Sequence, residues 1–141
     1  MRNLVAYIFV SLINTLLFTS CLEEYEPHSQ YVDSTNTILY DKYYTRIGQI
    51  DTLGRIWNSS YTVVGHIDND GKVKDKYYTR IGEIKKVSET YYNVKDANYD
   101  RVGHININNG RVTDENYNLI GYGKGNEIWK SGVILLLFDL E

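Results

Sequence analysis

The stretch "YDKYYTRIGQI", from Tyr40 to Ile50, recurs almost letter for letter as "KDKYYTRIGEI", from Lys74 to Ile84. Aligning the chain on the tyrosine that opens "YTRIG" gives five frames, spaced 17, 17, 21 and 18 residues apart. A period this regular indicates an array of equivalent structural units. The five frames open at Tyr44, Tyr61, Tyr78, Tyr99 and Tyr117.

Each frame contains two short apolar runs and two turns. The second run centres on an apolar residue five positions before the next tyrosine: Leu39, Ile56, Val73, Val94 and Val112. An Asx residue stands three positions before each tyrosine: Asp41, Asn58, Asp75, Asp96 and Asp114. Because an Asx side chain can bond the backbone two residues further on, it favours a tight turn. The frame therefore predicts a strand, an Asx turn and a second strand.

The composition favours an all-β fold. The chain has 14 tyrosines, 11 glycines and a single proline, which suits strands and turns. One hairpin cannot bury a core alone, but five hairpins can share their apolar faces. We therefore predict a pseudo-five-fold radial array of short β-hairpins over residues 37–141. The extra residues of the third frame, 85–92, are expected to lie entirely in its second turn.

A glycine recurs in the middle of the first strand of every frame. Glycine is unfavourable in a strand unless the position leaves no space for a Cβ atom or forms a bulge. Two interpretations stay open: crowding near the axis of the array, or a series of bulges. The glycines are Gly48, Gly65, Gly82, Gly103 and Gly121.

Several frames within residues 37–130, such as the one that opens at Tyr44, come close to the pattern Tyr/Arg-x-x-Ile-Gly-x-Ile-x-x-x-Gly-x-Ile-x-Asp. This pattern resembles that of β-flower lipoproteins of Gram-negative bacteria, here of the five-fold type. The resemblance implies a ring of hairpins and a lipidated cysteine upstream. It implies no enzymatic activity.

The C-terminal segment 132–141 is "GVILLLFDLE". Its apolar residues from Val133 to Phe138 are consecutive and do not alternate with polar ones. Such a run is typical of a strand that is covered on both faces. We therefore expect a closing strand across the array or against its first hairpin.

The first 20 residues have the features of a secretory signal. Arg2 precedes fifteen mostly apolar residues, from Leu4 to Phe18, which are too few to span a bilayer as a helix. Cys21, the only cysteine, follows directly and resembles the modified residue of a bacterial lipobox. We expect Cys21 to carry palmitate and other acyl chains. An ordinary signal peptide followed by a free cysteine is the alternative.

Residues 21–36 are expected to form an acidic tether. Glu23, Glu24 and Glu26 resemble the tag that directs some lipoproteins to the cell surface. The alternative is a solvated linker without a targeting role. The N-terminal features together predict a protein anchored in the outer membrane and displayed at the surface.

Two sets of residues are candidate sites. His66, Glu83 and His104 each follow a repeated glycine and are the ligand types of a two-histidine, one-carboxylate metal site. They are ordinary polar strand residues if they face outward. Tyr43, Trp57 and Tyr77 offer exposed rings on which a ligand such as a sugar can stack, although strand tyrosines also serve packing.

The sequence contains no nucleophile motif, so no catalytic residue is expected, and it indicates no cofactor. The net charge of −3 disfavours nucleic acid as a partner. The expected partners are the membrane, through the lipid anchor, and a glycan or an envelope protein. The leading interpretation is a non-enzymatic binding or structural module of the bacterial envelope, with a metal-binding protein or small metalloenzyme, or a glycan-binding module, as the alternatives.

Overall fold

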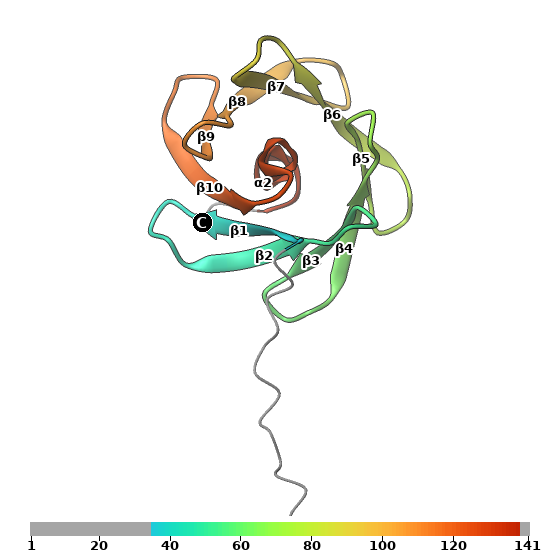
Figure 1. Cartoon of the computed structure of the whole chain (residues 1–141). Helices are drawn as coiled ribbons and strands as arrows, with labels where there is room; N and C mark the ends of the chain where they lie inside the picture. The colour runs from blue at the N-terminus through green and yellow to red at the C-terminus, as the bar shows by residue number, and fades with distance from the viewer. Residues whose placement is uncertain (1–34, 139–141) are drawn as a thin grey trace, which may run out of the picture. The chain divides into compact units, whose positions relative to one another are not determined.

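The computed structural model describes residues 35–138, which belong to one compact unit. Ten antiparallel strands form a closed barrel, with each strand paired to its neighbours in the chain and the last paired to the first. Figure 1 shows this ring and the C-terminal helix α2 at its centre. The strands are β1 (Thr37–Asp41), β2 (Arg46–Ile50), β3 (Arg55–Asn58), β4 (Val63–Ile67), β5 (Lys72–Asp75), β6 (Arg80–Lys86), β7 (Tyr91–Asp96), β8 (Arg101–Asn106), β9 (Arg111–Asp114) and β10 (Leu119–Gly125).

The barrel confirms the prediction of an all-β fold built from five hairpins. Each hairpin joins an odd-numbered strand to the next even-numbered strand through an Asx turn. Consecutive strands run in opposite directions, so the five Asx turns lie at one end of the barrel, which we call the Asx end. The chain enters β1 at Thr37, at the opposite end, which we call the entry end.

A layer of aliphatic side chains lines the inside of the barrel. Leu39, Ile56, Val73, Val94 and Val112, the five residues predicted to centre the second apolar run, are each 0 % exposed. The isoleucines that end the first runs complete most of the layer, because alternate residues of a strand face the same side. They are Ile50, Ile67, Ile84 and Ile105, and all belong to the same buried cluster.

The repeated glycines lie inside the barrel, one beside a bulge in every hairpin. In the first hairpin Leu39 pairs with Gly48 and Tyr40 pairs with Arg46, so Ile47 is the extra residue. A Cβ atom on any of the five glycines would meet the carbonyl oxygen of a residue on an adjacent strand. Crowding and bulges, the two interpretations of the sequence pattern, therefore occur at the same positions.

The C-terminal segment does not form the predicted closing strand. It forms a 3₁₀ helix, η1 (Ile128–Val133), followed by the short helix α2 (Ile134–Leu137), and both pack inside the barrel. The prediction is wrong because β1 and β10 already close the sheet, so no strand edge is left to pair with. A helical segment satisfies its own backbone and needs no such edge.

Five consecutive residues of this inner segment each contact a different hairpin glycine. A Cβ atom on Gly82 would lie 2.6 Å from Leu136 Cδ1, and one on Gly65 would lie 3.0 Å from Leu137 Cδ1. We call residues 128–138 the plug. The glycine contacts run in reverse order along the chain: Ile134 with Gly121, Leu135 with Gly103, Leu136 with Gly82, Leu137 with Gly65 and Phe138 with Gly48.

The extra residues of the third frame are not confined to a turn, as the sequence had suggested. They extend β6 and β7, which pair as far as Lys86 and Tyr92. Only residues 87–90 lie outside the two strands. An even number of added residues lengthens both strands of a hairpin without changing which face each side chain occupies.

Candidate functional site

The Asx turns share one geometry. In the first turn Asp41 Oδ1 accepts hydrogen bonds from the backbone N–H groups of Tyr43 and Thr45, both at 2.8 Å. The Tyr44 N–H also donates to the Asp41 carbonyl oxygen at 3.1 Å. The tyrosine that opens each frame adopts a left-handed conformation, with φ between 57° and 69°. This conformation is rare for residues other than glycine.

Three of the four turns at the entry end carry glycine at the left-handed position, and the first of them repeats the hydrogen bonds of the Asx turns around Asp51. Gly54, Gly71 and Gly110 have φ between 72° and 87°. A Cβ atom on Gly54 would meet the carbonyl oxygen of Ile67 in the next hairpin, so a side chain is excluded there. At the Asx end that position is a tyrosine in all five turns.

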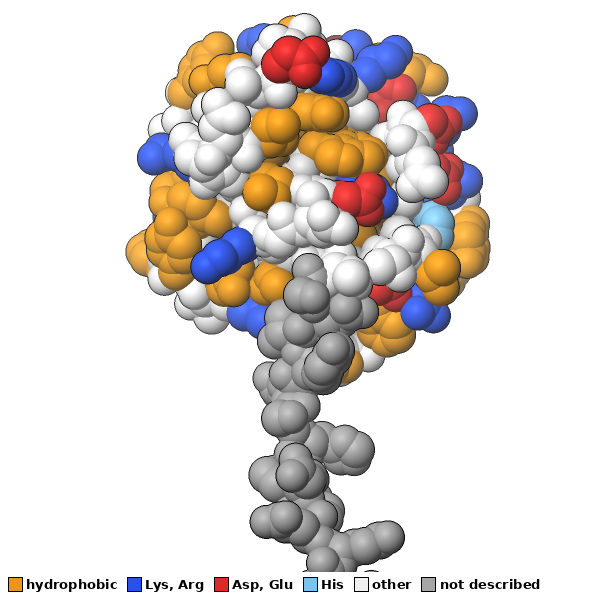
Figure 2. Space-filling model, in the orientation of Figure 1, with side chains coloured by type: hydrophobic (Ala, Val, Ile, Leu, Met, Phe, Trp, Pro, Cys, Tyr) orange, Lys and Arg blue, Asp and Glu red, His pale blue; other side chains and the backbone are white. Residues whose placement is uncertain are grey.

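The turn tyrosines are exposed, whereas the strand-rich sequence favours half-buried positions for them, packed on neighbouring strands. Their exposed fractions range from 52 % to 73 %, and Tyr43 and Tyr77 are each 76 % exposed. Figure 2 shows hydrophobic side chains at several places around the edge of the molecule, among charged and polar ones. The Asx end is therefore rich in exposed tyrosine.

Each turn tyrosine lies beside an outward-facing residue of the neighbouring hairpin. Tyr44 stacks on Tyr122 with ring centroids 4.2 Å apart, and the ring centroids of Tyr117 and His104 are 4.5 Å apart. The other three contacts join Tyr78 with His66, Tyr61 with Arg46, and Tyr99 with Arg80. The tyrosines therefore link adjacent hairpins on the outer surface.

The predicted aromatic trio does not form one site. Tyr43 and Tyr77 lie on the turns of different hairpins, and Trp57 is half-buried on β3. The Trp57 indole donates a hydrogen bond to Asp51 Oδ2 at 3.0 Å. Within residues 35–138, no ring contact joins any two of the three.

The predicted metal trio is not brought together either. His66, Glu83 and His104 lie on β4, β6 and β8, and they face outward because the glycine before each faces inward. In the part of the chain that the structure describes, no three His, Cys, Asp or Glu side chains lie close enough to hold a metal ion. The outward-facing interpretation of these residues is the one that agrees with the geometry.

His104 differs from the other outward-facing residues because it is only 6 % exposed. Its Nε2 atom is buried and has no hydrogen-bond partner. Burial lowers the pKa of His104, and the nearby Arg101 lowers it further, against the opposing effect of Asp114. Both effects favour the neutral imidazole over the protonated one.

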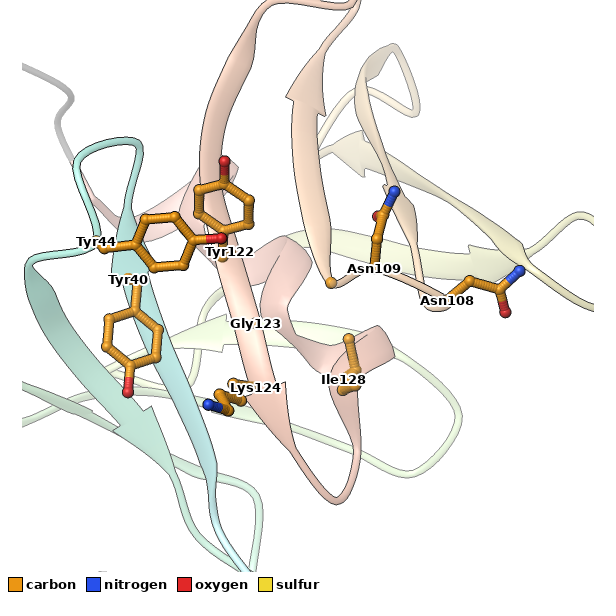
Figure 3. Close-up of a pocket in the computed structure, with 9 residues that line it drawn as sticks. Tyr40, Tyr44, Asn108, Asn109, Tyr122, Gly123, Lys124 and Ile128 are labelled. Carbon is orange, nitrogen blue, oxygen red and sulfur yellow. The ribbon is translucent and has the colours of Figure 1, made fainter.

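Two pockets lie side by side on the outer surface and share Asn109. The larger, of about 430 Å³, is lined by tyrosines from β1, the first Asx turn and β10, and by asparagines from the β8–β9 turn. Figure 3 shows Tyr44 and Tyr122 against one another, with Asn109 across from them. Its lining residues are Tyr40, Tyr44, Asn108, Asn109, Gly110, Tyr122, Gly123, Lys124 and Ile128.

The smaller pocket, of about 270 Å³, lies over β8 and β9. Its lining residues are Tyr91, His104, Asn106, Asn109, Arg111, Thr113 and Tyr117. Arg111 also acts on the larger pocket: hydrogen bonding with Tyr122 raises the pKa of Tyr44, and the charge of Arg111 acts in the opposite direction.

Sequence reasoning identified one residue of these pockets, His104, and assigned it to a metal. The missed signal was the departure of the last two frames from the repeat. The neutral Asn106 stands where the first two frames have Asp51 and Asp68, and Tyr122 stands where the others have a polar residue. Such departures mark the places where the units are not equivalent.

Cys21, the predicted signal over residues 1–20 and most of the predicted tether lie outside the described residues. Within residues 35–138, no helix has the length and apolar character that crossing a membrane requires.

The comparisons with known proteins agree with the geometry. A family model described as "5-fold beta-flower protein" matches residues 21–138, which is most of the chain. Neither a curated protein nor a solved structure matched the sequence. The five-fold repeat, the closed ring of hairpins and the family match lead to one conclusion: the chain belongs to the 5-fold beta-flower protein family.

Proposed function

We propose that this protein is a lipid-anchored, non-enzymatic binding module of the bacterial envelope, displayed from the outer membrane at the cell surface. The anchor is assigned to Cys21, which follows the apolar segment of a signal sequence. Two or three acyl chains hold a protein stably at a membrane.

The observation that carries the proposal is the position of the tyrosines relative to the point where the chain enters the barrel. β1 runs from Thr37 to the first Asx turn, so chain entry and the exposed tyrosines are at opposite ends. A tether attached at the entry end leaves the Asx end free. Exposed aromatic side chains are enriched where proteins bind partners.

The environments of the titratable groups favour binding over catalysis. Burial acts to raise the pKa of Asp51, but hydrogen bonds from Trp57 and Arg55 outweigh it and the pKa is lowered. The hydrogen bond from Asn118 lowers the pKa of Asp114. Both carboxylates accept hydrogen bonds from side chains a few residues further along the chain, so their charges hold local turns together.

Metabolic labelling with a palmitate analogue tests the anchor. Full-length protein expressed in a Gram-negative host is expected to take up label and to fractionate with membranes. The Cys21→Ser variant is expected to lose both properties while its barrel stays folded. Equal labelling of the two proteins would show that the anchor is assigned to the wrong residue.

Protease treatment of intact cells tests the surface display. The protein is expected to be digested in intact cells while a periplasmic marker survives. Lysed cells, in which both proteins are accessible, calibrate the intrinsic resistance of the barrel. Survival in intact cells together with digestion in lysed cells would place the protein on the inner side of the outer membrane.

A further inference from the structure

A row of outward-facing side chains crosses five strands, through both pockets. The register pairs Tyr91 with Asn106, Asn106 with Arg111, Arg111 with Tyr122, and Tyr122 with Tyr40. Neighbouring strands are about 4.8 Å apart, so the row extends over roughly 19 Å. We call these five residues the Arg111 row.

The two cations of this surface have no acidic partner, and for Arg111 the equivalent arginine of another hairpin does have one. Arg111 and Arg55 occupy the same position of the repeat. Arg55 pairs with Asp51 at 2.6 Å, but the neutral Asn106, paired with Arg111 across the two strands, replaces that aspartate. Within the described residues, neither Arg111 nor Lys124 has an ion pair, and neither pocket is lined by Asp or Glu.

The remaining lining groups are aromatic rings and neutral hydrogen-bonding groups. Tyr40, Tyr44 and Tyr122 form one wall of the larger pocket, and Asn109 faces them. In the smaller pocket the Asn106 amide donates to the Tyr91 hydroxyl at 3.1 Å. Rings that contact the C–H face of a sugar, with amides beside them for its hydroxyl groups, suit a saccharide.

His104 gives an independent indication that the smaller pocket takes a polar ligand. Its Nε2 atom is buried without a partner, and leaving such a group unsatisfied is costly. The Tyr117 ring that lies over the imidazole is 69 % exposed. It can turn aside without losing a core contact, and a ligand hydroxyl could then bond Nε2.

We propose that the Arg111 row and its two pockets bind an acidic oligosaccharide, a chain of sugar rings that carries carboxylate or sulfate groups. Arg111 at the middle of the row binds an acidic group in bidentate fashion, and the tyrosines on either side stack on sugar rings. Lys124 contributes a second positive charge at the far end of the larger pocket. The proposal rests on the binding role proposed above and supplies its ligand class.

The test is isothermal titration calorimetry of the purified protein with oligogalacturonate, a sialylated oligosaccharide and a heparin-derived hexasaccharide. The methyl ester of the oligogalacturonate is its neutral control. At least one acidic probe is expected to bind, with the neutral ester at least tenfold weaker. Amide NMR shifts on binding are expected at the Arg111 row and at the β8–β9 turn.

The Arg111→Ala variant is expected to bind at least tenfold more weakly than the unchanged protein. Arg55→Ala is the matched control, because it removes the same charge from the same position of another hairpin, and it is expected to bind normally. Tyr122→Ala is expected to weaken binding without changing the net charge. Thermal melts establish that each variant is folded.

Three results would overturn the proposal. They are the absence of binding by all three acidic probes, an equal loss of binding in the Arg111 and Arg55 variants, and equally tight binding of polyglutamate, which would show a general anion site. These measurements use purified protein and do not depend on where it is anchored. A failure of this proposal is therefore distinguishable from a failure of palmitate labelling or surface display.

Discussion

The turn tyrosines are the least expected feature at the scale of single residues. A left-handed conformation costs a side-chain-bearing residue about 1–2 kcal/mol, and three of the four entry-end turns avoid that cost by using Gly54, Gly71 and Gly110. Glycine would also suit the Asx end, yet a tyrosine stands there in each of the five turns. The side chain therefore supplies something that offsets the backbone strain, and its ring contacts with the next hairpin are one such gain.

This strain predicts an unusual order of stability. At Tyr78, Tyr78→Gly is expected to be more stable than Tyr78→Ala by about 1 kcal/mol, because both lose the ring but only glycine relieves the strain. At Tyr77, outside the left-handed region, the order should be reversed. Urea denaturation of the four variants measures both differences. The same order at the two positions would contradict a strained tyrosine.

His104 predicts a pH dependence of stability. Burial places its folded-state pKa below the ordinary histidine value of about 6.5. The unfolded chain therefore binds a proton first as the pH falls, and the free energy of unfolding decreases below about pH 6.5. His104→Gln, which copies Gln49 at the same repeat position, should weaken this dependence. Chemical denaturation from pH 5 to pH 8 measures it.

At the scale of elements, the hairpins could be predicted and the plug could not. The offsets of Asp41 and Leu39 from the frame tyrosine recur five times, and each repetition supports the same local geometry. The segment after Gly132 occurs only once, so no second copy was present with which its apolar run could be compared. An unbroken apolar run fits a buried strand or a buried helix equally well, and the closure of the barrel decided between them.

The pockets were not predictable for a different physical reason. Their residues come from three hairpins, and the pairing of β10 with β1 brings Tyr122 beside Tyr40 across most of the chain length. No local pattern in the sequence encodes that contact. The sequence itself shows only the loss of the acidic partner of Arg111 and the aromatic residue at position 122.

The fit of the plug inside the aliphatic layer gives a prediction for one element. A Cβ atom on Gly132 would lie 2.5 Å from Ile105 Cδ1 and 2.6 Å from Val94 Cγ2. Gly132→Ala is therefore expected to destabilise the protein by about 1–3 kcal/mol, as overpacking does. Adding Ile105→Val removes the clashing methyl and should recover part of the loss. Adding Ile67→Val, in the same layer but away from Gly132, should not.

At the scale of the whole molecule, the barrel is expected to depend on its plug. Leu39, Ile56 and Val94 are fully buried with the plug in place. A chain ending at Gly125 would leave this layer facing an unfilled interior. It is expected to lose its cooperative thermal transition by circular dichroism, whereas a chain ending at Phe138 should keep it. A cooperative transition in the shorter chain would show that the strands alone suffice.

The one-to-one correspondence between the plug and the hairpin glycines also limits how such a protein can evolve. Duplicating or deleting a hairpin is the simplest change open to a repetitive gene, and an open array of repeats tolerates it. Here a sixth hairpin would add an inward-facing glycine that no plug side chain contacts. Loss of a hairpin would leave one plug side chain without the glycine that makes space for it. A change in the number of hairpins therefore requires simultaneous changes in the plug residues, which favours the retention of five hairpins.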